Sequence, residues 1–220
     1  MTPELIIFDF DGTLADTTAT ILRTYRMAIK EAGAAPRSDA ECQATIGVPL
    51  REGFRQLYPD CSDSELDTYV KTYRKIFYAN KKDLIPQLYP GVKETLEKLA
   101  CMGIEMSIAS SRSRDSLIEF CEATGIDGFF SLILGADDVV HPKPDPEPVL
   151  VTLKRLGRDA SRSIMVGDMP VDIAMGLCAG CMTVGVTYGN STRHDLAAAG
   201  ASRIIDSMPE LTDIVRSLDK

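Results

Sequence analysis

The chain alternates short apolar runs with stretches of helical periodicity, and this alternation is interrupted once. Apolar runs bounded by Asp, Gly and Pro are typical of buried strands, whereas apolar residues at three-to-four spacing are typical of helices that cover a sheet. The predicted strands are 5–10, 104–109, 129–134, 163–166, 182–186 and, more weakly, 203–205. The helices predicted between them include 92–102, 116–123, 146–156 and 173–179. This order predicts an α/β, Rossmann-like fold with a parallel sheet and helices on both faces.

The interruption falls between the first two predicted strands, which lie about 95 residues apart, far more than an ordinary connection. From about residue 17 to residue 85 the pattern is almost wholly helical, as in Ile21, Tyr25 and Ile29. We therefore predict an α/β core formed by residues 1–16 and 86–220, with a helical cap domain inserted at 17–85. The return segment 85–91 contains two prolines and a glycine, which favours an extended linker leading into a helix.

Charge excludes one class of function. The 220 residues carry 24 Lys and Arg against 32 Asp and Glu, a net charge of −8. A nucleic-acid binder held by phosphate contacts needs a basic face, so no nucleic-acid partner is expected. Within 17–86 there are 11 basic and 9 acidic residues, against 13 and 23 elsewhere. A slightly cationic insert suits an anionic substrate, although ordinary surface variation explains the difference as well.

The sequence also indicates where the protein resides. No apolar run approaches the roughly 20 residues that span a bilayer, so no membrane partner is expected. The first residues lack the pattern of a secretory signal, and a cytoplasmic location is predicted. The six cysteines are then expected to be reduced, buried and apolar in role. Cys178 and Cys181 have the Cys-x-x-Cys spacing, but no second pair completes a zinc site.

Two pairs of carboxylates follow predicted strands. Asp9 and Asp11 end the first apolar run, and Asp168 and Asp172 follow the fourth. Sites in open parallel sheets form at the carboxyl ends of the strands, so Asp168 should lie beside Asp9. If the extended conformation persists, Asp9 and Asp11 point the same way and Phe10 points into the core. Converging carboxylates repel one another unless a cation lies between them, which predicts a Mg²⁺ site.

These residues and two further segments resemble the four motifs of the haloacid dehalogenase-like hydrolase superfamily, in order and spacing. The motifs are Asp9-Phe10-Asp11-Gly12-Thr13, Ser110 after an apolar strand, Lys143-Pro144-Asp145-Pro146, and Gly167-Asp168 with Asp172. The helical insert directly after the first motif is similar to the cap of the phosphoglycolate phosphatase and β-phosphoglucomutase branch. The resemblance covers nearly the whole chain.

The resemblance implies a role for each of these residues. Asp9 would be the nucleophile that forms an aspartyl phosphate, and Asp11 the general acid and then the base. Asp9, Asp168 and the backbone carbonyl of Asp11 would hold Mg²⁺, with Asp172 as a ligand or as a partner of a ligand. Lys143, held in a rigid segment by Pro142 and Pro144, would balance the charge of Asp9 and of the phosphoryl group.

Phosphate binding is expected next to these groups. Ser110 would bind a phosphate oxygen, and Ser111 and the following helix N-terminus would add backbone donors. In the cap, the segment 45–49 and Arg51 are the candidates for contacts with the substrate. An isolated arginine at a helix start is as often a solvated residue, so both interpretations of Arg51 stay open.

The resemblance, taken with the paired carboxylates, implies a Mg²⁺-dependent phosphatase that hydrolyses a small anionic phosphorylated metabolite through an aspartyl phosphate, similar to phosphoglycolate phosphatase. Asp11 argues against a dehalogenase, because cleavage of a carbon–halogen bond needs no acid there. A phosphomutase, for which Arg51 would bind a sugar phosphate, and a pyrophosphatase remain alternatives. A catalytically silent phosphate-binding module is the alternative from another class. A monomer and a homodimer are both compatible with the sequence.

Overall fold

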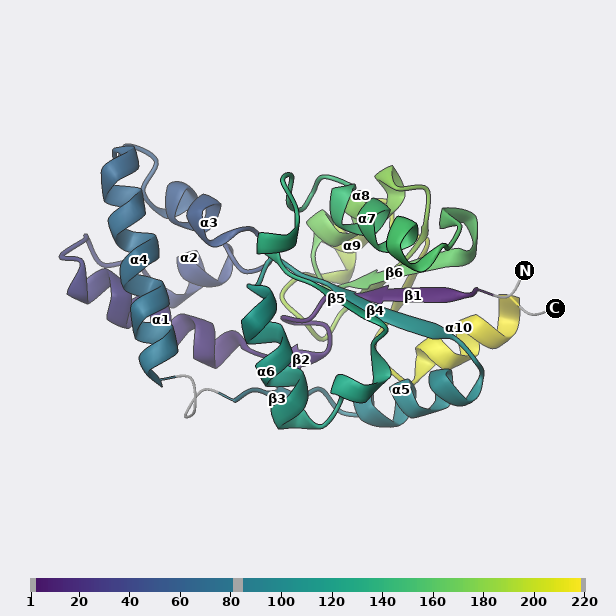
Figure 1. The fold of residues 1–220 in the computed structure, drawn as a ribbon. Helices are drawn as coiled ribbons and strands as arrows, with labels where there is room; N and C mark the ends of the chain where they lie inside the picture. The colour runs from purple at the N-terminus through teal and green to yellow at the C-terminus, as the bar shows by residue number, and fades with distance from the viewer. Residues whose placement is uncertain (1–2, 81–84, 219–220) are drawn as a thin grey trace.

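The computed structural model describes residues 3–80 and 85–218. Within these residues, six parallel strands form one sheet in the order β5-β4-β1-β6-β7-β8 (Figure 1). The strands are β1 Leu5–Phe8, β4 Glu105–Ala109, β5 Leu132–Leu134, β6 Ser163–Gly167, β7 Met182–Val186 and β8 Arg203–Ile205. The central strand β1 pairs with β4 on one side and with β6 on the other. The predicted parallel α/β sheet is confirmed.

Helices cover both faces of the sheet, and β1 shows why its sequence is continuously apolar. Ile6 and Phe8 point into one hydrophobic cluster, whereas Leu5 and Ile7 point into another, as the two-residue period of a strand requires. The helices are α5 Val92–Cys101, α6 Arg114–Thr124 and α10 Glu210–Leu218 on the first face, and α7 Glu147–Leu156 and α8 Pro170–Cys178 on the second (Figure 1). The short α9, Arg193–Ala198, packs against α8, β7 and β8.

Two predicted strands were too long by two or more residues. The strand predicted at 5–10 ends at Phe8, because the backbone turns at Phe10, whose carbonyl accepts hydrogen bonds from the N–H groups of Leu14 and Ala15. Phe10 is nevertheless fully buried in the core, as predicted. The strand predicted at 129–134 is reduced to β5, because Phe129 belongs to the 3₁₀ turn Asp127–Phe129 and residues 130–131 connect that turn to the strand.

The insert consists of helices that enclose a hydrophobic cluster of their own. They are α1 Thr18–Glu31, α2 Asp39–Gln43, α3 Leu50–Leu57 and α4 Asp63–Asn80. Tyr25 and Phe54 meet edge to face at the centre of this cluster, with ring centroids 5.1 Å apart. Figure 1 shows these helices as a group facing the carboxyl ends of the strands. Residues 81–84, which belong to the predicted cap, lie outside the described residues.

The two connections between insert and core are paired with each other. Strand β2, Ala15–Asp16, runs antiparallel to β3, Gln87–Leu88, with Ala15 opposite Leu88. The extended conformation predicted for the return segment is confirmed at residues 87–88. That segment is a paired strand and not a free linker, because the outgoing chain lies beside it.

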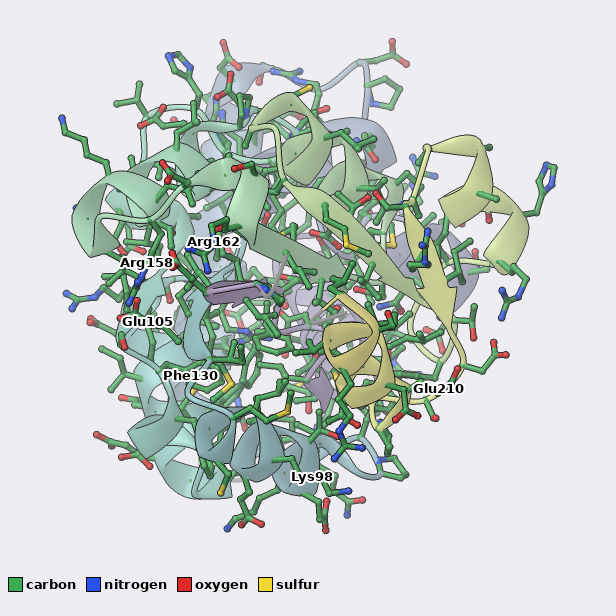
Figure 2. The ribbon with its side chains drawn as sticks, turned by 90° about the vertical axis from the view of Figure 1, so that its right-hand side faces the viewer. Lys98, Glu105, Phe130, Arg158, Arg162 and Glu210 are labelled. Atoms are coloured by element: carbon green, nitrogen blue, oxygen red, sulfur yellow. The ribbon has the colours of Figure 1, made fainter. Side chains whose placement is uncertain are left out.

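The end of the molecule that lies away from the insert carries ordinary surface ion pairs. Figure 2 views this end, where Arg158 and Arg162 lie near Glu105. The Nε of Arg158 is 2.8 Å from a carboxylate oxygen of Glu105, and Arg158 and Arg162 both pair with Glu4. Such partly exposed pairs contribute little to stability. The buried carboxylates Asp9, Asp11, Asp168 and Asp172 lie instead beyond the carboxyl ends of β1 and β6.

The six cysteines are free thiols, but the expectation that all are buried is wrong. Cys42, Cys121 and Cys181 are buried, whereas Cys101 and Cys178 are exposed and Cys61 is intermediate. Cys101 ends α5 and Cys178 ends α8, on the outer sides of helices that bury only one face. Among the described residues, no helix is both long and apolar enough to cross a membrane.

Candidate active site

Three adjacent strands of the sheet each deliver a polar side chain to the same edge. Asp9, Ser110 and Asp168 directly follow β1, β4 and β6. Because these strands are parallel neighbours, their carboxyl ends meet at one place. The structure brings Asp168 close to Asp9, as the sequence predicts.

Asp9, Asp168 and Asp172 form a buried acidic cluster in which one ligand atom of each lies within 4.8 Å of those of the others. Lys143 is inserted beside it. Its Nζ donates hydrogen bonds of 2.6 Å to Oδ1 of Asp9 and of 2.6 Å to Oδ1 of Asp172. The Lys143 side chain is only 1% exposed, so its charge is almost fully withdrawn from water. One cation thus pairs with two of the three carboxylates.

Burial shapes the protonation of this cluster. Burial, reinforced by the charges of Asp172 and Asp11, raises the pKa of Asp9 from 3.8 to about 7, although Lys143 acts in the opposite direction. Burial and the neighbouring carboxylates of Asp172 and Asp9 raise the pKa of Asp168 to about 8. Burial alone would lower the pKa of Lys143, but Asp172 and Asp9 outweigh it and raise that pKa. The cluster is therefore short of positive charge.

Asp168 is held by groups from two other segments. Its Oδ2 accepts hydrogen bonds from the backbone N–H of Asn190 at 2.7 Å and from the Asn190 amide at 3.0 Å, and its Oδ1 accepts one from Thr13 at 3.1 Å. Gly12 adopts a φ of +85°, and a Cβ there would lie 2.2 Å from Oδ2 of Asp168. Glycine is therefore required at this turn on both grounds.

Asp172 connects the cluster to α8. Its Oδ2 accepts a hydrogen bond of 3.0 Å from the backbone N–H of Met169, the residue before the helix, while its Oδ1 faces Lys143. This acid in the first turn thus satisfies a free N–H at the helix start. The helix begins at Pro170, three residues before the predicted start at 173.

Asp11 lies apart from the acidic cluster and pairs with Arg112. The Arg112 guanidinium donates to both carboxylate oxygens of Asp11, at 2.7 to 3.2 Å. The prediction that the side chains of Asp9 and Asp11 point the same way required an extended backbone through both residues. The strand ends at Phe8, before either of them. Arg112 was not among the predicted site residues. The sequence feature that could have indicated it is its position in a polar loop, two residues after Ser110.

The two serines of the predicted phosphate site have different surroundings. Ser110 is buried and lines the cavity described below, and its Oγ lies 3.4 Å from the backbone nitrogen of Arg112. Ser111 donates a hydrogen bond of 2.8 Å to the carbonyl of Gly47 in the insert. In this structure Ser111 therefore links the core to the insert.

A cavity of about 380 Å³ lies between the core and the insert. The core contributes Asp9, Asp11, Ser110 and Arg112, and the insert contributes largely apolar groups such as Tyr25 and Phe77. Small-molecule sites in proteins have volumes of this order. The predicted cap segment 45–49 also lines the cavity.

Arg51, the predicted cap residue, lines the same cavity but has protein partners. Its guanidinium forms ion pairs with Asp63 and Asp67, both in α4 of the insert. The side chain is 46% exposed. A substrate at Arg51 would therefore compete with two carboxylates.

The donor set of the acidic cluster fits a divalent metal ion. Carboxylate oxygens are the ligands that hard cations prefer, and Asp9, Asp168 and Asp172 each offer one within a small volume. Burial and the neighbouring carboxylates both raise the pKa of Asp9 and of Asp168, so the ionised forms of these groups are disfavoured. A bound divalent cation would favour those ionised forms.

The metal-free protein is therefore expected to lose stability as the pH rises. The folded-state pKa values of Asp9 and Asp168 lie above the ordinary value, so their contribution is fully present below about pH 4 and is lost as the pH rises through about 7 to 8. Thermal unfolding in chelator should show this decline. A divalent cation should raise the Tm more at about pH 8.5 than at about pH 5. An equal rise at both pH values would contradict this electrostatic account.

Comparison with known proteins decides the family. Residues 6–186 match a protein family that is described as "Haloacid dehalogenase-like hydrolase". The chain belongs to the haloacid dehalogenase-like hydrolases. The family resemblance of the four motifs is thereby confirmed, and the chain is an enzyme.

Individual relatives of this hydrolase are named phosphatases. "Probable phosphatase IndB" of Dickeya dadantii is 36% identical over 98% of this chain and 95% of that protein. "Pyrophosphatase PpaX" of Bacillus velezensis is 34% identical over 95% of this chain and 94% of its own length. A solved structure from Bacteroides fragilis, described as a haloacid dehalogenase-like hydrolase, is 31% identical. It superposes with a TM-score of 0.90 and covers 95% of this chain and 99% of its own.

Proposed function

We propose that this hydrolase is a Mg²⁺-dependent phosphatase that acts on a small anionic phosphorylated metabolite through an aspartyl phosphate on Asp9. The observation that carries the proposal is the buried cluster of Asp9, Asp168 and Asp172 with Lys143 between Asp9 and Asp172. The names of the relatives, phosphatase and pyrophosphatase, support the same class of reaction.

In this proposal Asp9, Asp168 and Asp172 would hold Mg²⁺. When bound, the ion would neutralise negative charge shared by Asp9 and the substrate phosphoryl group. Lys143 contributes a positive charge to the same place from the protein itself, and it orients Asp9 through the hydrogen bond to Oδ1. Ser110 lines the cavity, and its hydroxyl would donate to a phosphate oxygen.

The reaction would take place in two steps. A carboxylate oxygen of Asp9 attacks phosphorus, the bond from phosphorus to the leaving oxygen breaks, and Asp11 gives that oxygen a proton. Asp11 then takes a proton from water while the water oxygen attacks phosphorus. The bond between phosphorus and the Asp9 oxygen breaks, which releases phosphate and restores both carboxyl groups.

The cavity supports a small substrate and hydrolysis. Its volume of about 380 Å³ suits a compact metabolite, and its insert side is largely apolar, which helps to exclude bulk water. The mutase alternative depended on Arg51, and the two ion pairs of that residue do not favour it.

Phosphate release from a substrate panel tests the proposed activity. Pyrophosphate, phosphoglycolate, sugar phosphates and nucleotides should be compared with Mg²⁺ and with excess chelator. We expect release from small substrates that depends on Mg²⁺, because the acidic cluster then gains the charge it lacks. Release that chelator does not affect would contradict the metal role. Binding of phosphate without any turnover would favour the silent binding module.

A further inference from the structure

The guanidinium of Arg112 is buried in the wall of the cavity, beside Asp11. Its side chain is 9% exposed, and that of Asp11 is 12% exposed. Besides the contacts to both oxygens of Asp11, it donates a hydrogen bond of 3.1 Å to the hydroxyl of Ser116. Two aromatic rings flank it. The guanidinium carbon lies 4.8 Å from the ring centroid of Phe120 and 5.4 Å from that of Phe77.

This arrangement fixes the guanidinium in one plane. Stacking on aromatic faces and the hydrogen bond to Ser116 hold it without neutralising its charge. Burial alone would lower the pKa of Arg112, but Asp11 outweighs this and raises that pKa, so the residue stays charged. Its planar fork accepts a carboxylate or a phosphate through two parallel hydrogen bonds. Asp11 occupies that fork in this structure.

The other basic residues near the cavity are less suited to binding an anionic group of the substrate. Arg51 pairs with Asp63 and Asp67, and Arg74 is exposed on α4. Lys143 is bound to Asp9 and Asp172 on the nucleophile side. Among the described residues that line the cavity, Arg112 is thus the arginine with its guanidinium withdrawn from solvent.

We propose that Arg112 binds a second anionic group on the leaving-group side of the substrate, so that the enzyme selects small phosphate esters or anhydrides with a further carboxylate or phosphate. This inference rests on the proposed phosphatase function. Arg112 contacts Asp11, the residue that serves the leaving oxygen, and Phe77 of the insert. It therefore lies where the leaving group extends from the phosphoryl site. The second anion replaces Asp11 as the partner of the guanidinium, and the Asp11 carboxyl group is released toward the leaving oxygen, to which it gives its proton.

Matched substrates provide the test. Phosphoglycolate carries a carboxylate where 2-hydroxyethyl phosphate carries a neutral hydroxymethyl group, and pyrophosphate supplies a phosphate. In the wild-type enzyme, kcat/KM should be higher for both anionic substrates than for 2-hydroxyethyl phosphate. The Arg112→Gln variant should lower this preference about 10- to 100-fold, since a charged hydrogen-bond donor is lost. Comparing phosphoglycolate with pyrophosphate distinguishes a carboxylate from a phosphate.

The ratio of the two kcat/KM values separates binding from positioning. If Arg112 only positioned Asp11, the variant would lower kcat/KM equally for anionic and neutral leaving groups, and the proposal would be wrong. Arg114→Gln is the matched control, because Arg114 begins α6 and its side chain is 52% exposed. This control should keep the wild-type ratio. Arg112→Lys, which retains the charge but loses the fork, should give an intermediate ratio and serves if the Gln variant does not fold.

A binding measurement keeps the inference separate from the proposed activity. Calorimetry with methylenediphosphonate and methylphosphonate compares ligands with two anionic groups and one. The wild-type protein should bind the first more tightly, and Arg112→Gln should lose that difference. If wild-type protein releases no phosphate from any substrate but shows this difference, the proposed function fails and the anion site stands. Equal affinities for the two ligands would overturn the anion site itself.

Discussion

Replacing Asp9 by asparagine is expected to reduce phosphate release by a factor of about 10⁴ or more, the scale of loss when a catalytic nucleophile is removed. Asparagine has nearly the same shape, and its amide oxygen can still accept the hydrogen bond from Lys143. The amide nitrogen, however, cannot form an acyl phosphate. The fold should persist, because the substitution removes a buried charge whose pKa is raised to about 7.

Two measurements check the Asp9→Asn result. Steady-state phosphate release gives the loss of activity, and acid quenching with labelled substrate should trap a phosphoryl-enzyme in the wild type but not in the variant. Asp213→Asn is the control, because Asp213 is an exposed residue of α10. A trapped phosphoryl-enzyme in Asp9→Asn would assign the nucleophile to another residue.

Replacing Lys143 by methionine is expected to lower both stability and activity. The change leaves Asp9 and Asp172 without their buried cation, and breaking such a pair costs about 3–5 kcal/mol in the free energy of unfolding. Turnover should fall by about 10² to 10³, the scale of losing one group that stabilises transition-state charge. In the metal-free variant the loss of stability should be smaller at low pH, where the carboxyl groups are protonated.

Chemical denaturation at two pH values, with phosphate release measured in parallel, checks the Lys143→Met result. Lys154→Met is the control, because Lys154 is exposed in the last turn of α7. Lys143→Gln can still donate hydrogen bonds, so its comparison with methionine separates charge from hydrogen bonding. Wild-type stability in Lys143→Met would mean that the carboxylates do not need this cation.

The acidic cluster was predictable because two simple patterns coincide. A strand buried on both faces is continuously apolar, so Asp9 could be recognised in the sequence as an acid near the end of the apolar run predicted at 5–10. The same pattern preceded Asp168, and parallel topology brings such strand ends together. The shortened strand at 129–134 shows the limit, because apolar residues also occur in a 3₁₀ turn that packs on the core.

The pairing of Arg112 with Asp11 could not be predicted in the same way. The two residues are 101 positions apart, and the burial of Arg112 depends on Phe77 from the insert and Phe120 from α6. In the sequence, Arg112 is a charged residue in a polar loop, where a solvated side chain is the usual outcome. Asn190 is similar, because its contact with Asp168 depends on a turn that follows β7.

The pairing of Ala15 with Leu88 has a consequence for how the chain is connected. To the core, residues 17 to 86 are the loop of a β-hairpin whose two ends are already held side by side. The entropic cost of closing such a loop grows only slowly with its length, so the core tolerates a long inserted segment that packs around its own hydrophobic cluster. A different helical unit could span the same two ends without disturbing Asp9 or Lys143. The contacts that the insert makes with a substrate can then diversify while the core residues stay unchanged.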